Sequence, residues 1–145
     1  MNEGRMKKFV KPAIVTVLFL AIAGAATGLY LFNLRPRNLS KARPDFVISA
    51  TDLQNEFEKD ENAATAKYTG KVIEVTGEIL SVKQGQNNSV SVNLKTSSAM
   101  SSVICTFPSA NKPAGLAEGS NAVIHGVCSG YLMDVLLNNC ALPAK

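Results

Sequence analysis

The stretch KYTGKVIEVTGEIL, Lys67 to Leu80, holds the pattern that decides the fold. From Ile73 to Ile79 the odd-numbered residues are apolar or glycine and the even-numbered ones polar, which predicts a β-strand with one buried face. Glycine weakens the interior of a flat strand, so a strand that keeps Gly77 is expected to bend, bulge or turn a barrel corner. Leu80 and Val82 take the opposite parity, which predicts a bulge near Gly77 to Ile79.

Four further short strands are predicted downstream, separated by polar residues or by proline and glycine. They are residues 90–95, 103–107, 121–128 and 132–140. In the fourth strand we expect the even-numbered residues inside and His125 outside, and in the fifth we expect Val135 and Leu137 inside. Five short strands with a bent first strand fit a five-stranded OB-fold barrel, a mainly β fold.

One or two short helices are predicted ahead of the first strand. Ser49 has Asp52 three positions on, a capping-box-like start with aspartate in place of the usual glutamate. Leu53 and Phe57, four residues apart, fall on one face of a helix. Asp60 then offers a cap for a second short helix.

Residues 13–32 form an uncharged, largely apolar run of 20 residues. An α-helix of that length spans about 30 Å of hydrocarbon, so we predict a transmembrane helix that acts as a signal anchor. Ala23-Gly24-Ala25 also fits the cleavage site of a secretory signal peptide, so cleavage and export is the alternative. We favour the retained anchor, because cleavage after Ala25 would leave an exposed apolar N-terminus.

Charge divides the chain sharply. Residues 1–44 carry eight basic and one acidic side chain, 8 − 1 = +7, whereas residues 45–145 carry seven lysines and ten acids, 7 − 10 = −3. Basic residues beside an apolar helix are ordinary interfacial anchors, and both flanks hold four, so the positive-inside rule does not fix the orientation. We expect a single-pass protein of the bacterial inner membrane with its C-terminal domain in the periplasm. The predicted segments are a basic tail at 1–12, the membrane helix at 13–32, a linker at 33–45, the OB-fold domain at 46–141 and a C-terminal tail at 142–145.

Three stretches resemble the tRNA_anti-like family of bacterial OB-fold proteins. They are ATDLQNEFEKDENAATAKYTGKVIEVTGEI at 50–79, VICTF at 103–107 and LAEGSNAVIHGVCSGYLMDVLLNNC at 116–140. Members of this family are commonly small envelope proteins behind an N-terminal signal or membrane helix. The family is named for structural likeness to a tRNA-anticodon-binding OB domain. The resemblance, over residues 46–141, implies the fold and supplies no catalytic residues.

The three cysteines and the single histidine form no predicted catalytic or metal site. Cys105, Cys128 and Cys140 lack C-x-x-C spacing, and His125 is expected on the face opposite Cys128. A zinc site needs about four converging ligands, and Cys–His catalysis needs both side chains on one face, so we predict no metal, no cofactor and no enzyme. In an OB barrel the third and fifth strands are parallel neighbours. Cys105 and Cys140 could therefore form a disulfide outside the cytosol.

The ligand face of an OB fold lies on its second and third strands and the adjoining turns. The predicted face residues are Ser91, Asn93, Ser102, Ile104, Thr106 and Tyr131. Single-strand binding uses a basic groove and stacking aromatics, and this face offers at most Tyr131. We predict a non-enzymatic binding module for an envelope protein or small ligand, with single-stranded RNA or DNA binding as the alternative. Gly24 and Gly28 form a G-x-x-x-G pair that could support a weak homodimer.

Overall fold

A computed structural model describes residues 3–32 and 38–145, with side chains described at 14–30 and 38–145. The chain forms two compact units, residues 1–35 and 36–145. The first unit is one helix, α1 (Glu3–Phe32). Among the described residues, no helix is long and apolar enough to cross a membrane. The side chains of the predicted basic tail at 1–12 and both ends of the predicted span at 13–32 lie outside that description, as do residues 33–37 of the predicted linker.

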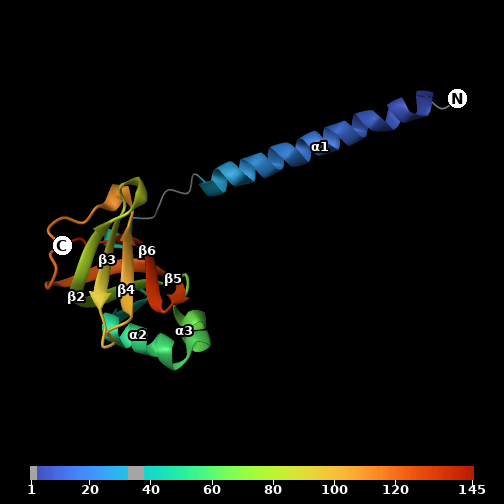
Figure 1. Ribbon diagram of the computed structural model, residues 1–145. Coiled ribbons are helices and arrows are strands. Elements are labelled where there is room, and N and C mark those ends of the chain that lie inside the picture. The colour runs from blue at the N-terminus through green and yellow to red at the C-terminus, as the bar shows by residue number, and fades with distance from the viewer. Residues whose placement is uncertain (1–2, 33–37) are drawn as a thin grey trace. The chain divides into compact units, whose positions relative to one another are not determined.

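The second unit is a mainly β barrel with two helices at one end (Figure 1). Its strands are β1 (Phe46–Ser49), β2 (Val72–Gln84), β3 (Val90–Lys95), β4 (Ser102–Phe107), β5 (Asn121–Leu132) and β6 (Asp134–Ala141). Its α-helices are α2 (Ala50–Lys59) and α3 (Glu61–Tyr68), and its 3-10 helices are η1 (Leu39–Lys41), η2 (Gln86–Asn88) and η3 (Ser109–Asn111).

Strands β2 to β6 close the barrel. They run in the order β2-β3-β4-β6-β5, and a further β2–β5 pairing joins the two ends. The β4–β6 pair is parallel and the other barrel pairs are antiparallel. This arrangement confirms the predicted five-stranded barrel, consistent with an OB fold. The short strand β1, which pairs in parallel with β2, was not predicted.

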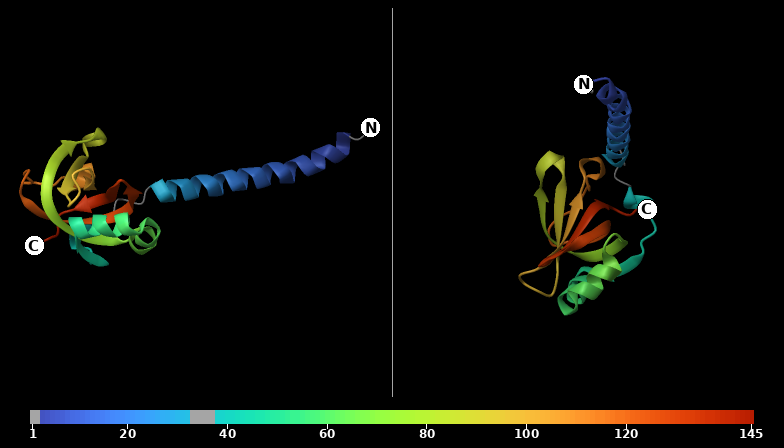
Figure 2. Two further views of the ribbon diagram at one scale, coloured as in Figure 1. Left: turned by 60° about the horizontal axis from the view of Figure 1, so that its bottom comes forward. Right: turned by 90° about the vertical axis from the view of Figure 1, so that its right-hand side faces the viewer.

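The long strand β2 supplies the bend that closes the sheet, and Figure 2 shows it arching across the barrel. Its first half, Val72–Glu78, pairs with β5, and its second half, from Ile79 onward, pairs with β3. The register shifts between Ile79 and Ser81, so the bulge lies at Leu80, just beyond its predicted place. Strand β2 thus pairs first with β5 and then with β3.

Gly77 is required by close packing. A Cβ built on Gly77 would lie 3.0 Å from the Ala50 Cβ and 3.3 Å from the Leu94 Cβ. Its φ lies outside the left-handed region, so an unusual backbone angle is not the reason for the glycine. Gly77 lies next to the point where β2 passes from β5 to β3, and its role in the bend stays a prediction. The glycine lets the start of α2 lie directly against β2.

Local capping explains where both α-helices start, as predicted. The Ser49 hydroxyl accepts a hydrogen bond from the Asp52 N–H at 3.0 Å and donates to the Asp52 carboxylate at 2.7 Å. The Asp60 carboxylate accepts from the Ala63 N–H at 3.0 Å and starts α3. Leu53 on α2 is fully buried, so this helix seals one end of the barrel.

A carboxylate of α2 is tied to the end of α3. The Glu56 carboxylate accepts hydrogen bonds from Lys67 Nζ at 2.9 Å and from the Tyr68 hydroxyl at 2.7 Å. These two bonds, that of Lys67 first, lower the pKa of Glu56. The side chains of Lys67 and Glu56 are 45% and 40% exposed, so the pair contributes modestly to holding the two helices together.

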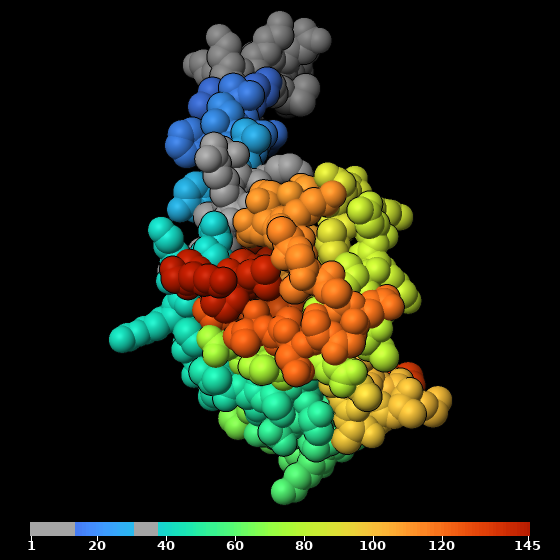
Figure 3. Space-filling view, turned by 90° about the vertical axis from the view of Figure 1, so that its left-hand side faces the viewer, coloured from blue at the N-terminus to red at the C-terminus, as the bar shows by residue number. Residues whose placement is uncertain are grey.

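The segment ahead of β1 packs on the barrel. Leu39 is fully buried, and the Ser40 carbonyl accepts a hydrogen bond from the Ala144 N–H at 2.8 Å. Asp45 exchanges two hydrogen bonds with Val72, at 2.7 and 2.9 Å. In Figure 3 the C-terminal residues, dark red, lie beside this cyan segment. The predicted linker is therefore, from residue 38 onward, part of the folded unit.

Candidate functional site

One outward face of the barrel carries most of the predicted ligand residues. Ser91 lies opposite Thr106 and Asn93 opposite Ile104 in the β3–β4 register. On either side the register adds Ser81 and Lys83 from β2 and Leu136 from β6. We call these seven residues the outer strand face, namely Ser81, Lys83, Ser91, Asn93, Ile104, Thr106 and Leu136. Lys83 is exposed and the other six are half-buried.

Two predicted face residues have other surroundings. Ser102 is 8% exposed, and its N–H and hydroxyl donate to Asp134 Oδ1 at 2.6 and 3.0 Å. The Tyr131 ring stacks on Phe57 of α2, with centroids 5.3 Å apart. Tyr131 also lies opposite the buried Val135 and so projects from the core side of the sheet. The structure therefore brings together Ser91, Asn93, Ile104 and Thr106, and places Ser102 and Tyr131 elsewhere.

The outer strand face combines hydrogen-bonding groups, one of them the charged Lys83 amine, with an apolar pair on its β4–β6 side. Its apolar members are Ile104 and Leu136. Its polar members are the hydroxyls of Ser81, Ser91 and Thr106, the Asn93 amide and the Lys83 amine. None of the seven is acidic or aromatic. Sequence reasoning missed Ser81, Lys83 and Leu136. The parity change after Leu80 could have assigned the two β2 residues to this face.

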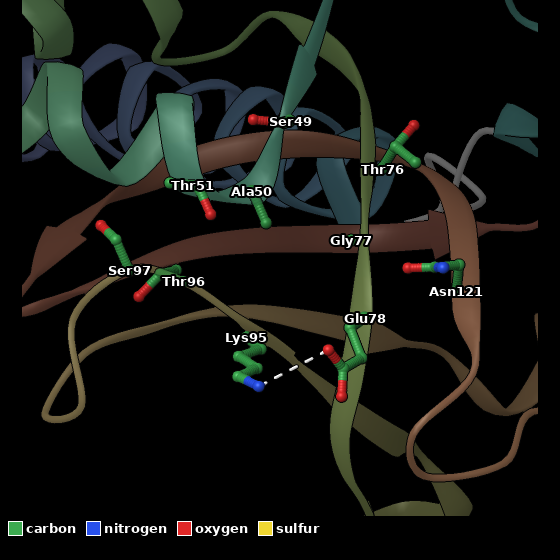
Figure 4. A pocket seen from close by; sticks show the side chains of 10 residues that line it. All are labelled: Ser49, Ala50, Thr51, Thr76, Gly77, Glu78, Lys95, Thr96, Ser97 and Asn121. Atoms are coloured by element: carbon green, nitrogen blue, oxygen red, sulfur yellow. Dashed lines mark ion pairs between the residues drawn. The ribbon is translucent and has the colours of Figure 1, made fainter.

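A pocket of about 360 Å³ lies beside Gly77, where the start of α2 meets β2 and the end of β3 (Figure 4). Hydroxyl and amide groups dominate its lining, which is Ser49, Ala50, Thr51, Thr76, Gly77, Glu78, Lys95, Thr96, Ser97 and Asn121. Glu78 and Lys95 contribute opposite charges, 3.6 Å apart and both about half exposed. This distance exceeds that of a strong charge-assisted hydrogen bond, so both groups stay available. Six of its ten lining residues carry a hydroxyl or an amide, so the pocket offers hydrogen-bonding groups beside apolar surface.

The prediction that His125 is exposed is wrong. His125 is 5% exposed, with Nδ1 2.9 Å from the Leu39 carbonyl and Nε2 2.7 Å from Glu74 Oε2. A carbonyl oxygen only accepts, so the His125 Nδ1–H donates to Leu39. The outward parity was right in direction, but η1 covers this part of the outer surface. Both ring nitrogens are engaged, so the histidine fastens η1 to β5 and β2.

The cysteines are packing residues in this structure. Cys105, Cys128 and Cys140 are buried and free. A hydrogen bond with Cys140, together with burial, raises the pKa of the Cys105 thiol well above its usual range, and burial raises that of Cys128. High pKa values disfavour the reactive thiolate. Cys105 and Cys140 adjoin one another, and their disulfide stays a prediction.

Metal binding has no candidate in the described part of the chain. Within the described residues, no group of three or more histidine, cysteine, aspartate or glutamate side chains is placed to hold a metal ion. The chemistry that the described surface can perform is hydrogen bonding and apolar contact. The outer strand face and the Gly77 pocket both offer it.

Comparison with known proteins shows the family of this chain. The family model for tRNA_anti-like proteins matches residues 1–142. The search of curated proteins gave no match. A similar solved structure is that of a lipoprotein from Klebsiella pneumoniae subsp. pneumoniae MGH 78578 for which nucleic-acid binding has been suggested. It shares 19% sequence identity at a TM-score of 0.57, over 67% of this chain and 91% of that one. At this identity the likeness concerns the fold.

Proposed function

Because this chain belongs to the tRNA_anti-like family, we propose that it is a non-enzymatic binding module whose outer strand face contacts an envelope protein or a small polar ligand. One observation carries the proposal. The outer strand face presents hydroxyl, amide and amine groups of β2, β3 and β4 beside an apolar pair, Ile104 and Leu136, on its β4–β6 side, in the place where OB folds bind their ligands. Hydrogen-bonding groups next to apolar contact area are typical of protein-binding surfaces.

Single-stranded nucleic acid is the second candidate ligand. The suggestion made for the Klebsiella lipoprotein favours it, and so does the lack of carboxylates among the seven residues of the outer strand face. Nucleic-acid affinity comes largely from lysine and arginine, and single strands also need stacking aromatics. The outer strand face offers Lys83 alone and no aromatic ring. Residues 45–145 carry −3 in total, so we rank this function second.

The first experiment tests the nucleic-acid ligand on the outer strand face. Residues 38–145, which keep Leu39 in the core, are titrated with labelled single-stranded RNA and DNA at about physiological ionic strength, where the Debye length is about 8 Å. We expect no saturable micromolar binding. Such binding, lost on changing Asn93 and Thr106 to alanine, would establish the nucleic-acid function instead.

A crosslinking experiment tests the protein-binding arm. A photoreactive amino acid replaces Asn93 in the full chain in its native envelope, and the same residue replaces Thr65, an exposed position on α3, as the matched control. We expect a discrete crosslinked protein from position 93 alone. Identical products from both positions, or none from position 93, would contradict a protein ligand on the outer strand face.

Placement in the bacterial envelope is part of the proposal. We infer from the uncharged run at 13–32 and its basic flanks that the chain is held at the inner membrane with the barrel in the periplasm. Alkaline carbonate should then leave the protein in the membrane fraction, and a phosphatase fused after Lys145 should be active. A soluble mature form starting near Ala26 would support the cleaved alternative. The Gly24 and Gly28 pair belongs to this proposal as a weak contact between two anchors.

A further inference from the structure

Three large apolar side chains project into solvent at one end of the barrel. Met100 is 83% exposed, Leu132 79% and Met133 66%. Met100 lies in the β3–β4 loop, gold and projecting in Figure 3, and the other two form the β5–β6 turn. Because β4 and β6 are parallel neighbours, the residues just before both strands meet at one edge, where Ser102 bonds Asp134. We call Met100, Leu132 and Met133 the apolar tip.

Helix α2 braces both loops of the apolar tip. The fully buried Gln54 donates through Nε2 to the Met133 carbonyl at 2.9 Å. It also donates to Glu58 Oε1 at 3.0 Å, and the Ser101 hydroxyl donates to the same oxygen at 3.1 Å. The β3–β4 loop and the β5–β6 turn are thereby tied to a single pair of side chains on α2. The apolar tip is a supported surface.

Met133 has a backbone conformation that methionine rarely adopts. Its φ is 66°, in the left-handed region where glycine and asparagine are usual and a bulky side chain costs free energy. The turn requires this backbone angle. Because the Met133 side chain is exposed, its burial in the barrel offsets little of that free-energy cost. A strained backbone that holds an apolar side chain in water suggests a role in contact with another molecule. Methionine adapts well to irregular apolar partners.

Two carboxylates adjoin the apolar tip: Glu58 accepts a hydrogen bond from the Ser101 hydroxyl, and Asp134, which follows Met133, accepts from Ser102. The helices α2 and α3, with the residue between them, carry five acids and two lysines, 2 − 5 = −3. The negative charge also acts on Tyr131, which precedes Leu132 in the sequence. Burial raises the pKa of Tyr131, and the negative charges of Glu58, Glu61 and Asp134 raise it further. An apolar surface beside carboxylates favours a partner that presents an apolar side chain together with positive charge.

We propose that the apolar tip docks a segment of a partner protein that presents an apolar side chain flanked by lysine or arginine. Charge complementarity selects this class, because the adjoining carboxylates repel nucleic-acid phosphates and an anionic membrane surface. They equally repel the tip of a second copy of the chain. The surface lies at the end of the barrel and shares no residue with the outer strand face, so it is a second binding site beyond the proposed function.

Methionine methyl resonances test the proposal in the full chain. The sequence has four methionines, Met1, Met6, Met100 and Met133, so selective ¹³C-methyl labelling gives two reporters and two internal controls. The probe is a nine-residue peptide of lysine and serine with one central leucine, added to the protein in a nonionic detergent. Its matched control replaces each lysine with glutamate. We expect the lysine peptide to shift the Met100 and Met133 signals saturably, and the glutamate peptide to leave these two signals unchanged.

Two variants locate the binding. Met100→Ser combined with Met133→Asn removes the apolar groups, and asparagine tolerates the left-handed turn, so the barrel should keep its unfolding midpoint. We expect this variant to bind the fluorescein-labelled lysine peptide at least tenfold more weakly. Leu80→Thr, at an apolar position 55% exposed elsewhere on the barrel, should bind it as the unchanged chain does. Equal affinity of the double variant, equal shifts from the glutamate peptide, or no shift of either reporter would each overturn the proposal.

Discussion

Replacing Gly77 by alanine tests why a glycine stands inside β2. The added Cβ would lie 3.0 Å from the Ala50 Cβ and 3.3 Å from the Leu94 Cβ. Ala50 is 1% exposed and Leu94 is fully buried, and the Ala50 methyl is fixed to the helix backbone and cannot rotate away. The new methyl group therefore forces β2 and the start of α2 apart by a few tenths of an ångström.

The expected loss in the free energy of unfolding follows from two opposing terms. Overpacking a buried site costs about 1–3 kcal/mol. Alanine regains about 0.5–1 kcal/mol, because glycine loses more chain entropy when a strand forms. The balance for Gly77→Ala is a loss of about 0–2.5 kcal/mol. Gly77→Val should lose more, since its branched side chain meets the same two neighbours.

Urea denaturation of residues 38–145, followed by circular dichroism, measures this loss. A matched cycle adds Ala50→Gly, which removes the atom closest to the new methyl. We expect the cost of Gly77→Ala to fall by at least about 0.5 kcal/mol in that background, because contacting residues are energetically coupled. An equal cost in both backgrounds, or greater stability of Gly77→Ala itself, would refute the close-packing explanation.

Three further predictions follow from contacts in the barrel. Gly126→Ala should lose about 2–3 kcal/mol in the urea assay, because its Cβ would meet the Cys140 sulfur at 2.7 Å, and a loss below that of Gly77→Ala would contradict this. Non-reducing peptide mapping of exported protein should find Cys105 linked to Cys140, and three free thiols would refute that link. Glu56→Gln should cost below about 1 kcal/mol at pH 7. Hydrogen bonds from a lysine and a tyrosine lower the pKa of Glu56, so its contribution is present above its ordinary 4.5 and is lost as the pH falls. A difference from wild type that does not shrink as the pH is lowered below 4.5 would contradict this assignment.

Local patterns predicted most of the barrel because each of them is set by neighbours in the chain. The alternation around Ile73 fixes a strand whatever its partners are, and the hydroxyl of Ser49 caps a helix by reaching three residues along. Strand β1 was not predicted, because its four residues are too few to show the alternation of apolar and polar side chains. Its pairing partner also lies about 27 residues downstream. That pairing is decided by tertiary packing.

Side-chain surroundings were harder to predict than strand positions. Parity placed Ser91 and Thr106 on one face, and the structure sets them opposite each other. Parity also turned His125 outward, but it does not reveal that a segment some 86 residues earlier covers that spot. For Tyr131 the register shift between Cys128 and Gly130 changes which side of the sheet the strand presents. Irregularities of this kind depend on the neighbouring strand.

The hydrogen bond between Ser40 and Ala144 sets the two ends of the folded unit side by side. A unit whose chain arrives and departs at one place can be spliced into a surface loop of another protein without stretching either end. It can also be circularly permuted, with a short link across the ends and a new opening in an exposed loop such as the one around Met100. Residues 38–145 are therefore suited to insertion into other proteins and to circular permutation.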